Sequence, residues 1–124
     1  MSKRKADVLE NAPPKAGKLE GKIILVTGGA QGMGLEVARL AASLGARGLC
    51  VVDRNGAKRN EVQETIAALG AECLFVECDV AVPEQIAMTV ASADKRFGRI
   101  DGLVNCVGDT RRGTLESTDV QLWE

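Results

Sequence analysis

The sequence predicts an α/β fold with a doubly wound parallel sheet, and three features carry that prediction. Short apolar runs begin near residues 23, 49, 74 and 102, and segments with the apolar spacing of helices separate them. Repeated strand–helix–strand units form parallel sheets with right-handed crossovers. Polar residues close the apolar runs, at the edge where such sheets bind their ligands.

The first apolar run leads into a glycine-rich turn and then into a helix. Ile23–Val26 contains no polar residue, as expected for a strand that is buried on both faces. The turn begins with Thr27 and holds glycines at positions 28, 29, 32 and 34. Residues 35–44 follow, with apolar residues at 37, 40, 41 and 44, and this spacing predicts one buried helix face.

This strand, turn and helix together predict a diphosphate site. A helix start leaves backbone N–H groups unpaired and carries partial positive charge, so it attracts an anion. Glycines allow the tight bend and the close approach of a ligand. The spacing G-x-x-x-G-x-G differs from the G-x-G-x-x-G of many dinucleotide-binding turns, and a flexible loop is the alternative. The turn residues predicted to bind the cofactor are Thr27, Gly28, Gln31, Gly32, Met33 and Gly34.

The second strand, Leu49–Asp53, ends in a carboxylate 19 residues after Gly34. An acidic residue about 20 residues beyond such a turn accepts hydrogen bonds from the adenosine ribose of a dinucleotide. Its charge repels a 2′-phosphate, so Asp53 predicts NAD as the cofactor, with NADP less favoured. Two alternatives stay open: Arg54 could serve a 2′-phosphate, and Asp53 could merely cap the turn that follows it.

Two further helices and two further strands complete the predicted alternation. Helices are expected over 58–69 and 83–97, and strands over 73–80 and 102–108. The apolar residues assigned to the inner faces of these helices are Val62, Ile66 and Leu69 in the first and Ile86, Val90, Ala93 and Phe97 in the second. Four polar residues at strand ends are then expected to face one crevice: Thr27, Asp53, Asp79 and Asn105.

The two ends of the chain lack the regular strand–helix alternation of its middle. Residues 1–20 are polar and without apolar periodicity, so they are predicted to be a disordered arm, and residues 21–124 to be the folded domain. Residues 109–114 are expected to form a loop, in which Arg111 and Arg112 either meet an anionic substrate or are simply solvated. A short helix is expected from about Asp119 to Glu124.

Composition excludes several classes of function. The net charge of −1 offers no basic surface for nucleic acid. No apolar run is long enough for a membrane span, and the first residues lack the apolar core of a signal peptide, so a cytoplasmic protein is expected. The four cysteines form no C-x-x-C and the chain has no histidine, so no metal site is predicted, and the thiols are expected to lie in the core.

With these residues in place, residues 20–124 resemble the N-terminal half of the short-chain dehydrogenase/reductase family. The turn from Thr27 to Gly34 looks like the cofactor motif of that family, and Asp53 matches its cofactor-choosing acidic position. Asp79-Val80 matches the pair that contacts the adenine. Asn105-Cys106-Val107-Gly108 stands where the family commonly has Asn-Asn-Ala-Gly, so Asn105 and Gly108 are kept and the middle two residues depart.

The resemblance implies an NAD(P)-binding Rossmann domain that is truncated after its fourth strand and the start of the next helix. In a full-length form it implies interconversion of a secondary alcohol and a ketone. The family's catalytic serine and Tyr-x-x-x-Lys pair lie beyond residue 124, so no catalytic residue is predicted in this chain, which also has no tyrosine.

Two alternatives to a truncated enzyme stay open. One is a non-catalytic module that binds NAD or a partner, and the other is a doubly wound binder of another sort, such as a flavodoxin-like one. The fourth strand is expected to leave an open edge carrying Leu103, Val104 and Val107, through which the chain could self-associate.

Overall fold

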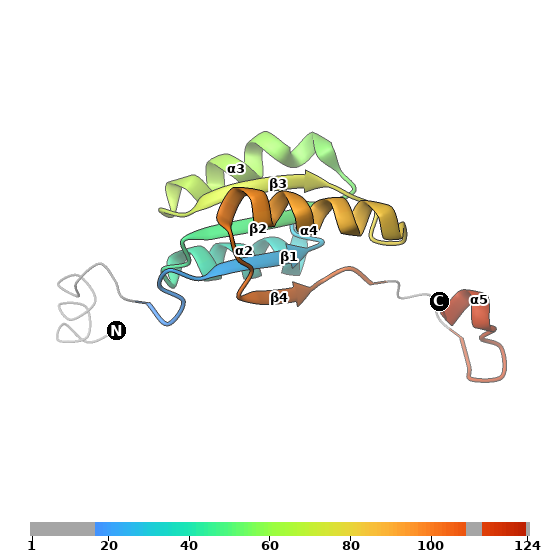
Figure 1. Cartoon of the computed structure of the whole chain (residues 1–124). Helices are drawn as coiled ribbons and strands as arrows, with labels where there is room; N and C mark the ends of the chain where they lie inside the picture. Colours follow the sequence, from blue (N-terminus) through green and yellow to red (C-terminus); the bar gives the residue numbers. More distant parts are fainter. Residues whose placement is uncertain (1–16, 109–112, 124) are drawn as a thin grey trace, which may run out of the picture.

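The computed structural model describes residues 17–108 and 113–123 and contains one parallel sheet covered by helices (Figure 1). The strands are β1 (Ile23–Thr27), β2 (Gly48–Asp53), β3 (Glu72–Glu77) and β4 (Gly102–Asn105). Their order in the sheet is β3-β2-β1-β4, and every neighbouring pair is parallel. After β1 the chain adds two strands on one side and then crosses to the other side. The boundary between β1 and β4 is therefore the topological switch point, beside which sheets of this kind bind ligands.

Helices cover both faces of this sheet, which confirms the predicted doubly wound α/β class (Figure 1). One face packs against α2 (Gly32–Ser43) and α3 (Arg59–Ala68), with Val26, Val51 and Phe75 in the core between them. The other face packs against α4 (Pro83–Phe97). A 3-10 turn, η1 (Gly56–Lys58), precedes α3, and a short helix, α5 (Val120–Trp123), lies near the end of the chain.

Two strands are shorter than the sequence predicted. The third strand, expected over 73–80, runs from Glu72 to Glu77, because Asp79 donates its backbone N–H to the side chain of Gln85 rather than to a neighbouring strand. The fourth strand, expected over 102–108, ends at Asn105. Beyond it, Cys106 donates its N–H to both the carbonyl and the hydroxyl oxygen of Thr27, and the chain then leaves the sheet.

The predicted inner faces of three helices are wrong in part. In α4 the buried row is Thr89, Ala93 and Phe97, whereas Ile86 and Val90 are 43% and 45% exposed. In α2 the buried residues are small, Gly34, Ala38, Ala41 and Ala42, and Leu40 is 59% exposed. Small side chains let α2 lie close to the sheet, and residue 40 falls outside that row. In α3, Val62 and Ile66 are buried as predicted, and Leu69 at its end is 40% exposed.

Part of the predicted N-terminal arm can be compared with the structure. Residues 1–16 lie outside the described residues. Residues 17–20 form a turn, in which Leu19 donates its N–H to the carbonyl of Leu44 at 3.1 Å and packs partly buried against the core. These contacts attach Leu19 to the end of α2, and the predicted domain boundary at residue 21 stays a prediction.

Candidate cofactor-binding site

Two glycines of the turn between β1 and α2 are required by the packing of the chain itself. Gly28 has a φ of +67°, and a Cβ there would lie 2.9 Å from the carbonyl oxygen of Cys106. Gly34 lies in the first turn of α2, where a Cβ would overlap the carbonyl oxygen of Gly28 and lie 2.7 Å from its carbon. Both positions therefore need glycine so that helix and strand can pack closely.

Gly32 needs glycine for a different reason. Its φ is +58°, a left-handed conformation, yet nothing lies within 4 Å of the position that a Cβ would take. Gly32 begins α2, and the preceding Gln31 is extended, with no side-chain hydrogen bond that caps the helix. The first N–H groups of a helix have no partner inside the helix. The open space at Gly32 thus lies beside backbone donors suited to an anion.

The amides earlier in the turn are already paired. Gly28 and Gly29 donate their N–H groups to the carbonyl oxygen of Val52, at 2.7 and 3.3 Å. Ala30 donates to the carboxylate oxygen Oδ2 of Asp53 at 3.0 Å. The first half of the turn is thus fastened to the end of β2, which leaves the amides at the start of α2 as the available donors.

Asp53 has two backbone partners. Besides the bond from Ala30, its Oδ1 accepts the N–H of Asn55 at 2.9 Å, so it does cap the turn after β2, as one alternative held. A carboxylate offers about four acceptor positions, and the two bonds leave capacity for ribose hydroxyls. The side chain is partly exposed, and Arg54 beside it is exposed. Turn capping and ribose binding are therefore compatible.

The ends of the four strands are joined along one edge of the sheet. At the switch point the Thr27 hydroxyl donates to the Asn105 side-chain oxygen at 3.3 Å and accepts the N–H of Cys106 at 3.1 Å. On the other side, Cys78 donates its N–H to the carbonyl of Asp53 at 3.0 Å, which places Asp79 and the half-buried Val80 next to the end of β2.

Thr27, Asp53, Asp79 and Asn105 lie at or just beyond the carboxyl ends of neighbouring strands, and that they face one crevice stays a prediction. Their role in binding stays a prediction, as does that of Gly108, which is exposed and is the last residue before a gap in the described chain. Arg111 and Arg112 lie in that gap, outside the described residues. The sequence could not indicate the hydrogen bond from Ala30 to Asp53, because the donor is a backbone N–H, which every residue except proline has.

Asp79 itself helps to hold this edge in shape. Its Oδ1 accepts the N–H of Ala81 at 3.0 Å, while its own N–H donates to the side-chain oxygen of Gln85 at 2.7 Å. Gln85 lies in the first turn of α4, so its contact fixes the chain between β3 and that helix. Neither the spacing nor the residue type of Gln85 indicated this role.

The cysteines are all free thiols. Cys50 is fully buried, and desolvation raises its pKa to about 12; desolvation also raises the pKa of Cys73 to about 11. Thiols with such pKa values are neutral at physiological pH and weak nucleophiles. Among residues 17–108 and 113–123, no group of three cysteine or acidic side chains is arranged to hold a metal ion.

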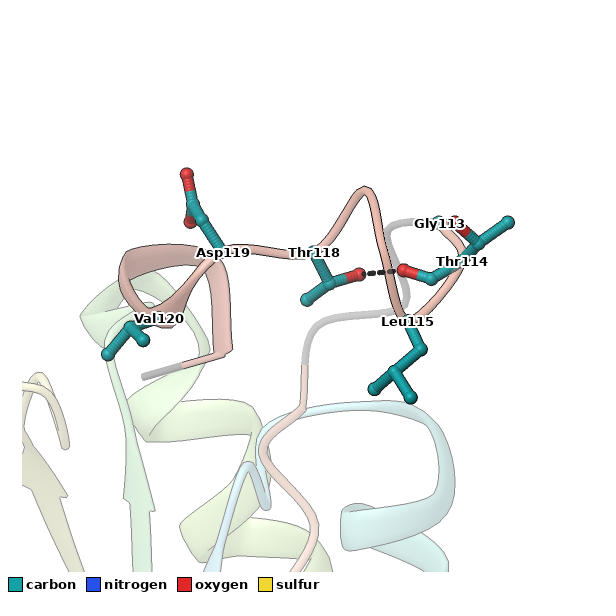
Figure 2. A pocket seen from close by; sticks show the side chains of 6 residues that line it. All are labelled: Gly113, Thr114, Leu115, Thr118, Asp119 and Val120. Atoms are coloured by element: carbon teal, nitrogen blue, oxygen red, sulfur yellow. Dashed lines mark hydrogen bonds between the residues drawn. The ribbon is translucent and has the colours of Figure 1, made fainter.

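A pocket in the described structure lies away from the glycine turn. It is lined by Gly113, Thr114, Leu115, Thr118, Asp119 and Val120, all from the segment around the start of α5 (Figure 2). Thr118 spans it by donating its hydroxyl to the carbonyl of Thr114 at 2.7 Å. None of the predicted cofactor residues contributes to it. We therefore locate the candidate site from the backbone donors of the glycine turn and not from this pocket.

Comparison with known proteins identifies the class to which this fold and site belong. Residues 22–124 match the family model described as short chain dehydrogenase, and the chain belongs to that family. In the part that the structure describes, no helix is long and apolar enough to cross a membrane.

Individual relatives show how much of the family fold this chain spans. It is 40% identical over 104 residues to (+)-cis,trans-nepetalactol synthase NEPS2 of Nepeta racemosa, an alignment that covers 84% of this chain and 38% of that protein. It is 38% identical over 106 residues to 2,3-dihydro-2,3-dihydroxybenzoate dehydrogenase of Bacillus subtilis (strain 168), covering 86% and 40%. The chain thus spans about two fifths of the length of these curated relatives.

Solved structures agree with the fold. The L-sorbose reductase of Gluconobacter frateurii, complexed with NADPH and L-sorbose, matches with a TM-score of 0.76 and 31% identity over 87% of this chain and 41% of that one. A xylitol dehydrogenase bound to NAD⁺ matches with a TM-score of 0.66 and 32% identity over 69% of this chain and 33% of that one. These two neighbours therefore carry different forms of the nicotinamide cofactor.

Proposed function

We propose that this chain binds the adenosine diphosphate half of a nicotinamide dinucleotide at the carboxyl edge of its sheet, with NAD preferred to NADP. The observation that carries the proposal is the start of α2, where the left-handed Gly32 leaves open space beside unpaired backbone donors. The NADPH- and NAD⁺-bound states of two related structures support the same class of ligand.

The residues along this edge fit the parts of such a ligand. The amides of residues 32–34 would hold the diphosphate, flanked by the side chains of Gln31 and Met33, and Asp53 would accept the adenosine ribose hydroxyls. Asp79 and Val80 would contact the adenine, with Asn105 and Gly108 beside the adenosine at the switch point. The preference for NAD rests on the negative charge of Asp53, while Arg54 is the residue through which a 2′-phosphate could still be accepted.

For the longer protein to which such a chain would belong, we propose an oxidoreductase that interconverts a secondary alcohol and a ketone. When bound, the nicotinamide ring supplies the hydride acceptor or donor. The residues described here bind and orient the adenosine half. The printed sequence contains no tyrosine, and we expect the 124-residue chain by itself to show little or no turnover.

A second candidate is a non-catalytic module that binds NAD or pairs with another chain. The observation in its favour is the edge of the sheet at β4, which pairs with β1 and, within the described residues, with no other strand. Leu103 and Val107 on or beside this strand are 59% and 51% exposed. Exposed apolar strand edges promote pairing between chains, so self-association through β4 is expected.

The test uses two glycines that share a positive φ and open surroundings. Gly32 and Gly70 both have a positive φ and open space at the Cβ position, but Gly70 follows α3, before the start of β3 and away from the proposed site. Alanine strains the backbone at both positions, and at Gly70, with its φ of +91°, no less than at Gly32. We expect Gly32→Ala to weaken NAD binding about tenfold or more in calorimetry, and Gly70→Ala to leave it unchanged.

Two results would contradict the proposal. One is the absence of binding heat with either NAD or NADP on folded, unaltered chain. The other is an equal loss of NAD affinity in the two glycine variants, which would trace the effect to general strain. Robust NADH production by the purified chain with any secondary alcohol would contradict the expectation of little turnover.

A further inference from the structure

The carboxylate of Asp53 is bonded to the glycine turn as well as to its own turn. Ala30 donates its N–H to Oδ2 at 3.0 Å, across 23 positions of sequence. The neighbouring amides of Gly28 and Gly29 donate to the carbonyl of Val52. Three successive amides of the turn are therefore held by the last two residues of β2, and in the third case the acceptor is a side chain.

This bond is difficult to replace. Ala30 is 3% exposed, so its N–H has little access to water. A buried donor that loses its acceptor is costly, and a bond to a carboxylate is stronger than one to a neutral oxygen. Within residues 17–108 and 113–123, Asp53 supplies the acceptor for this amide and no other group does. Without Asp53, the turn would have to shift or leave a donor unsatisfied.

The consequence reaches the phosphate donors directly. Ala30 is followed by Gln31, the N-cap of α2, and then by Gly32, where the open space for the diphosphate lies. A displacement at Ala30 is therefore transmitted to the start of the helix within two residues. Productive positions for such donors are narrow, because N–H···O distances lie within about 2.7–3.2 Å and the bonds weaken steeply at angles below about 120°.

We propose that Asp53 is a positioning residue for the diphosphate site, through its bond to the amide of Ala30, in addition to being the acceptor for the ribose. This inference rests on the proposed function and deepens it. Mutation of a residue that only recognises the ribose lowers the affinity for ligands that carry the ribose hydroxyls and leaves the affinity for other ligands unchanged. A residue that also positions the turn affects every ligand that carries the diphosphate, including one without those hydroxyls.

The experiment compares ADP with 2′,3′-dideoxy-ADP, which keeps the diphosphate and lacks both ribose hydroxyls. Each is titrated into the full chain and into Asp53→Ala and Asp53→Asn. We expect Asp53→Ala to lower the affinity for dideoxy-ADP about fivefold to tenfold, and the affinity for ADP by more. Asparagine keeps one acceptor oxygen, so Asp53→Asn should restore part of the dideoxy-ADP affinity.

A second measurement needs no ligand. Hydrogen exchange of the Ala30 amide, followed by NMR in the free chain, should be at least about tenfold faster in Asp53→Ala than in the unaltered chain. Asn55→Ala is the matched control, because the Asn55 side chain accepts from Ala57 while both bonds of Asp53 remain. Its Ala30 amide should exchange at the unaltered rate.

The outcomes separate the two proposals. If ADP binds and Asp53→Ala leaves dideoxy-ADP affinity unchanged, the positioning role is overturned while the proposed function stands. Unchanged exchange at Ala30 in Asp53→Ala overturns it as well. If the unaltered, folded chain binds neither ADP nor NAD, the proposed function fails and this inference falls with it.

Discussion

The two edges of the sheet contrast, although each is a parallel strand of largely apolar sequence. β3 exposes a glutamate at each end, Glu72 and Glu77, and α3 and α4 pack against its two faces. Glu72 also meets Arg96 of α4 at 3.4 Å. β4 packs Val104 toward the α2 side, whereas Leu103 on the opposite side is 59% exposed. Charge at a strand edge discourages pairing with another strand, and exposed apolar surface promotes it. The β3 edge is therefore protected against further pairing, whereas the β4 edge is not.

The largest contrast is expected from truncating one large apolar side chain on each edge. Phe75 of β3 is 2% exposed, so Phe75→Ala should lower the free energy of unfolding by about 3–5 kcal/mol. Leu103→Ala should cost less than about 1 kcal/mol, because most of that side chain is already in water. Urea denaturation measures the free energy of unfolding of both variants. Equal losses would show that the two side chains are buried to the same extent.

Two glycines at the amino ends of the strands on either side of β1 extend the comparison. A Cβ at Gly48 of β2 would lie 2.8 Å from Cζ of the Phe97 ring, so Gly48→Ala should cost about 1–3 kcal/mol through overpacking beneath α4. A Cβ at Gly102 of β4 would meet only the tip of Ile24, at 3.0 Å, and Gly102→Ala should cost less than about 1 kcal/mol. A larger loss at Gly102 than at Gly48, in thermal melts, would reverse the contrast.

A pH-dependent effect is expected where β4 begins. Asp101 accepts the N–H of Ile23 at 2.8 Å and bonds the Arg99 guanidinium, and the Arg99 hydrogen bond is the main cause of its lowered pKa. Because the folded-state pKa lies below the unfolded value of about 3.9, this carboxylate adds stability above that pH and loses it as pH falls through the folded pKa. Asp101→Asn should therefore melt below the unaltered chain at pH 7, and the difference should shrink in acid. A difference independent of pH would assign the effect to packing.

The smallest effect on stability, but a visible one on association, is expected for Leu103→Lys. An exposed position should change the free energy of unfolding by no more than about 0.5 kcal/mol, while the charge should suppress pairing at the β4 edge. Glu72→Asp, which keeps the charge on the β3 edge, is the control and should leave association unchanged. Sedimentation velocity over a range of protein concentrations measures self-association. If Leu103→Lys associates as strongly as the unaltered chain, the chains do not pair through the β4 edge.

Much of the fold could be predicted because its signals are local. The uninterrupted runs in β1 and β2 and the helix from Pro83 to Phe97 were found at or within one residue of their observed bounds. Asp53 was placed at a strand end for the same reason, since the run before it is continuous. The ends of β3 and β4 were placed too late, because Cys78, Val80, Cys106 and Val107 continue the apolar runs, whereas the backbone N–H of Asp79 bonds the side chain of Gln85 and not a neighbouring strand.

The helix faces needed information that the local pattern does not contain. Ile86 and Val90 have helical spacing with Ala93 and Phe97, yet the row that packs begins at Thr89, whose hydroxyl is satisfied by the carbonyl of Gln85 at 2.8 Å. Periodicity shows that a helix has an apolar side but not how it is rotated against the sheet. That rotation depends on which strands lie beneath and on the fit of Phe97 over Gly48.

By itself, the sequence determined the class of fold, the glycine turn and the acidic residue at the end of β2, because each is written in consecutive or regularly spaced residues. Only the tertiary structure decided that β3 is the opposite edge of the sheet, that the amide of Ala30 is held by Asp53, and that Val104 packs against the core whereas Leu103 faces water. Those facts join residues far apart in the chain. They arise from the packing of strands and helices against one another, which no short stretch of sequence records.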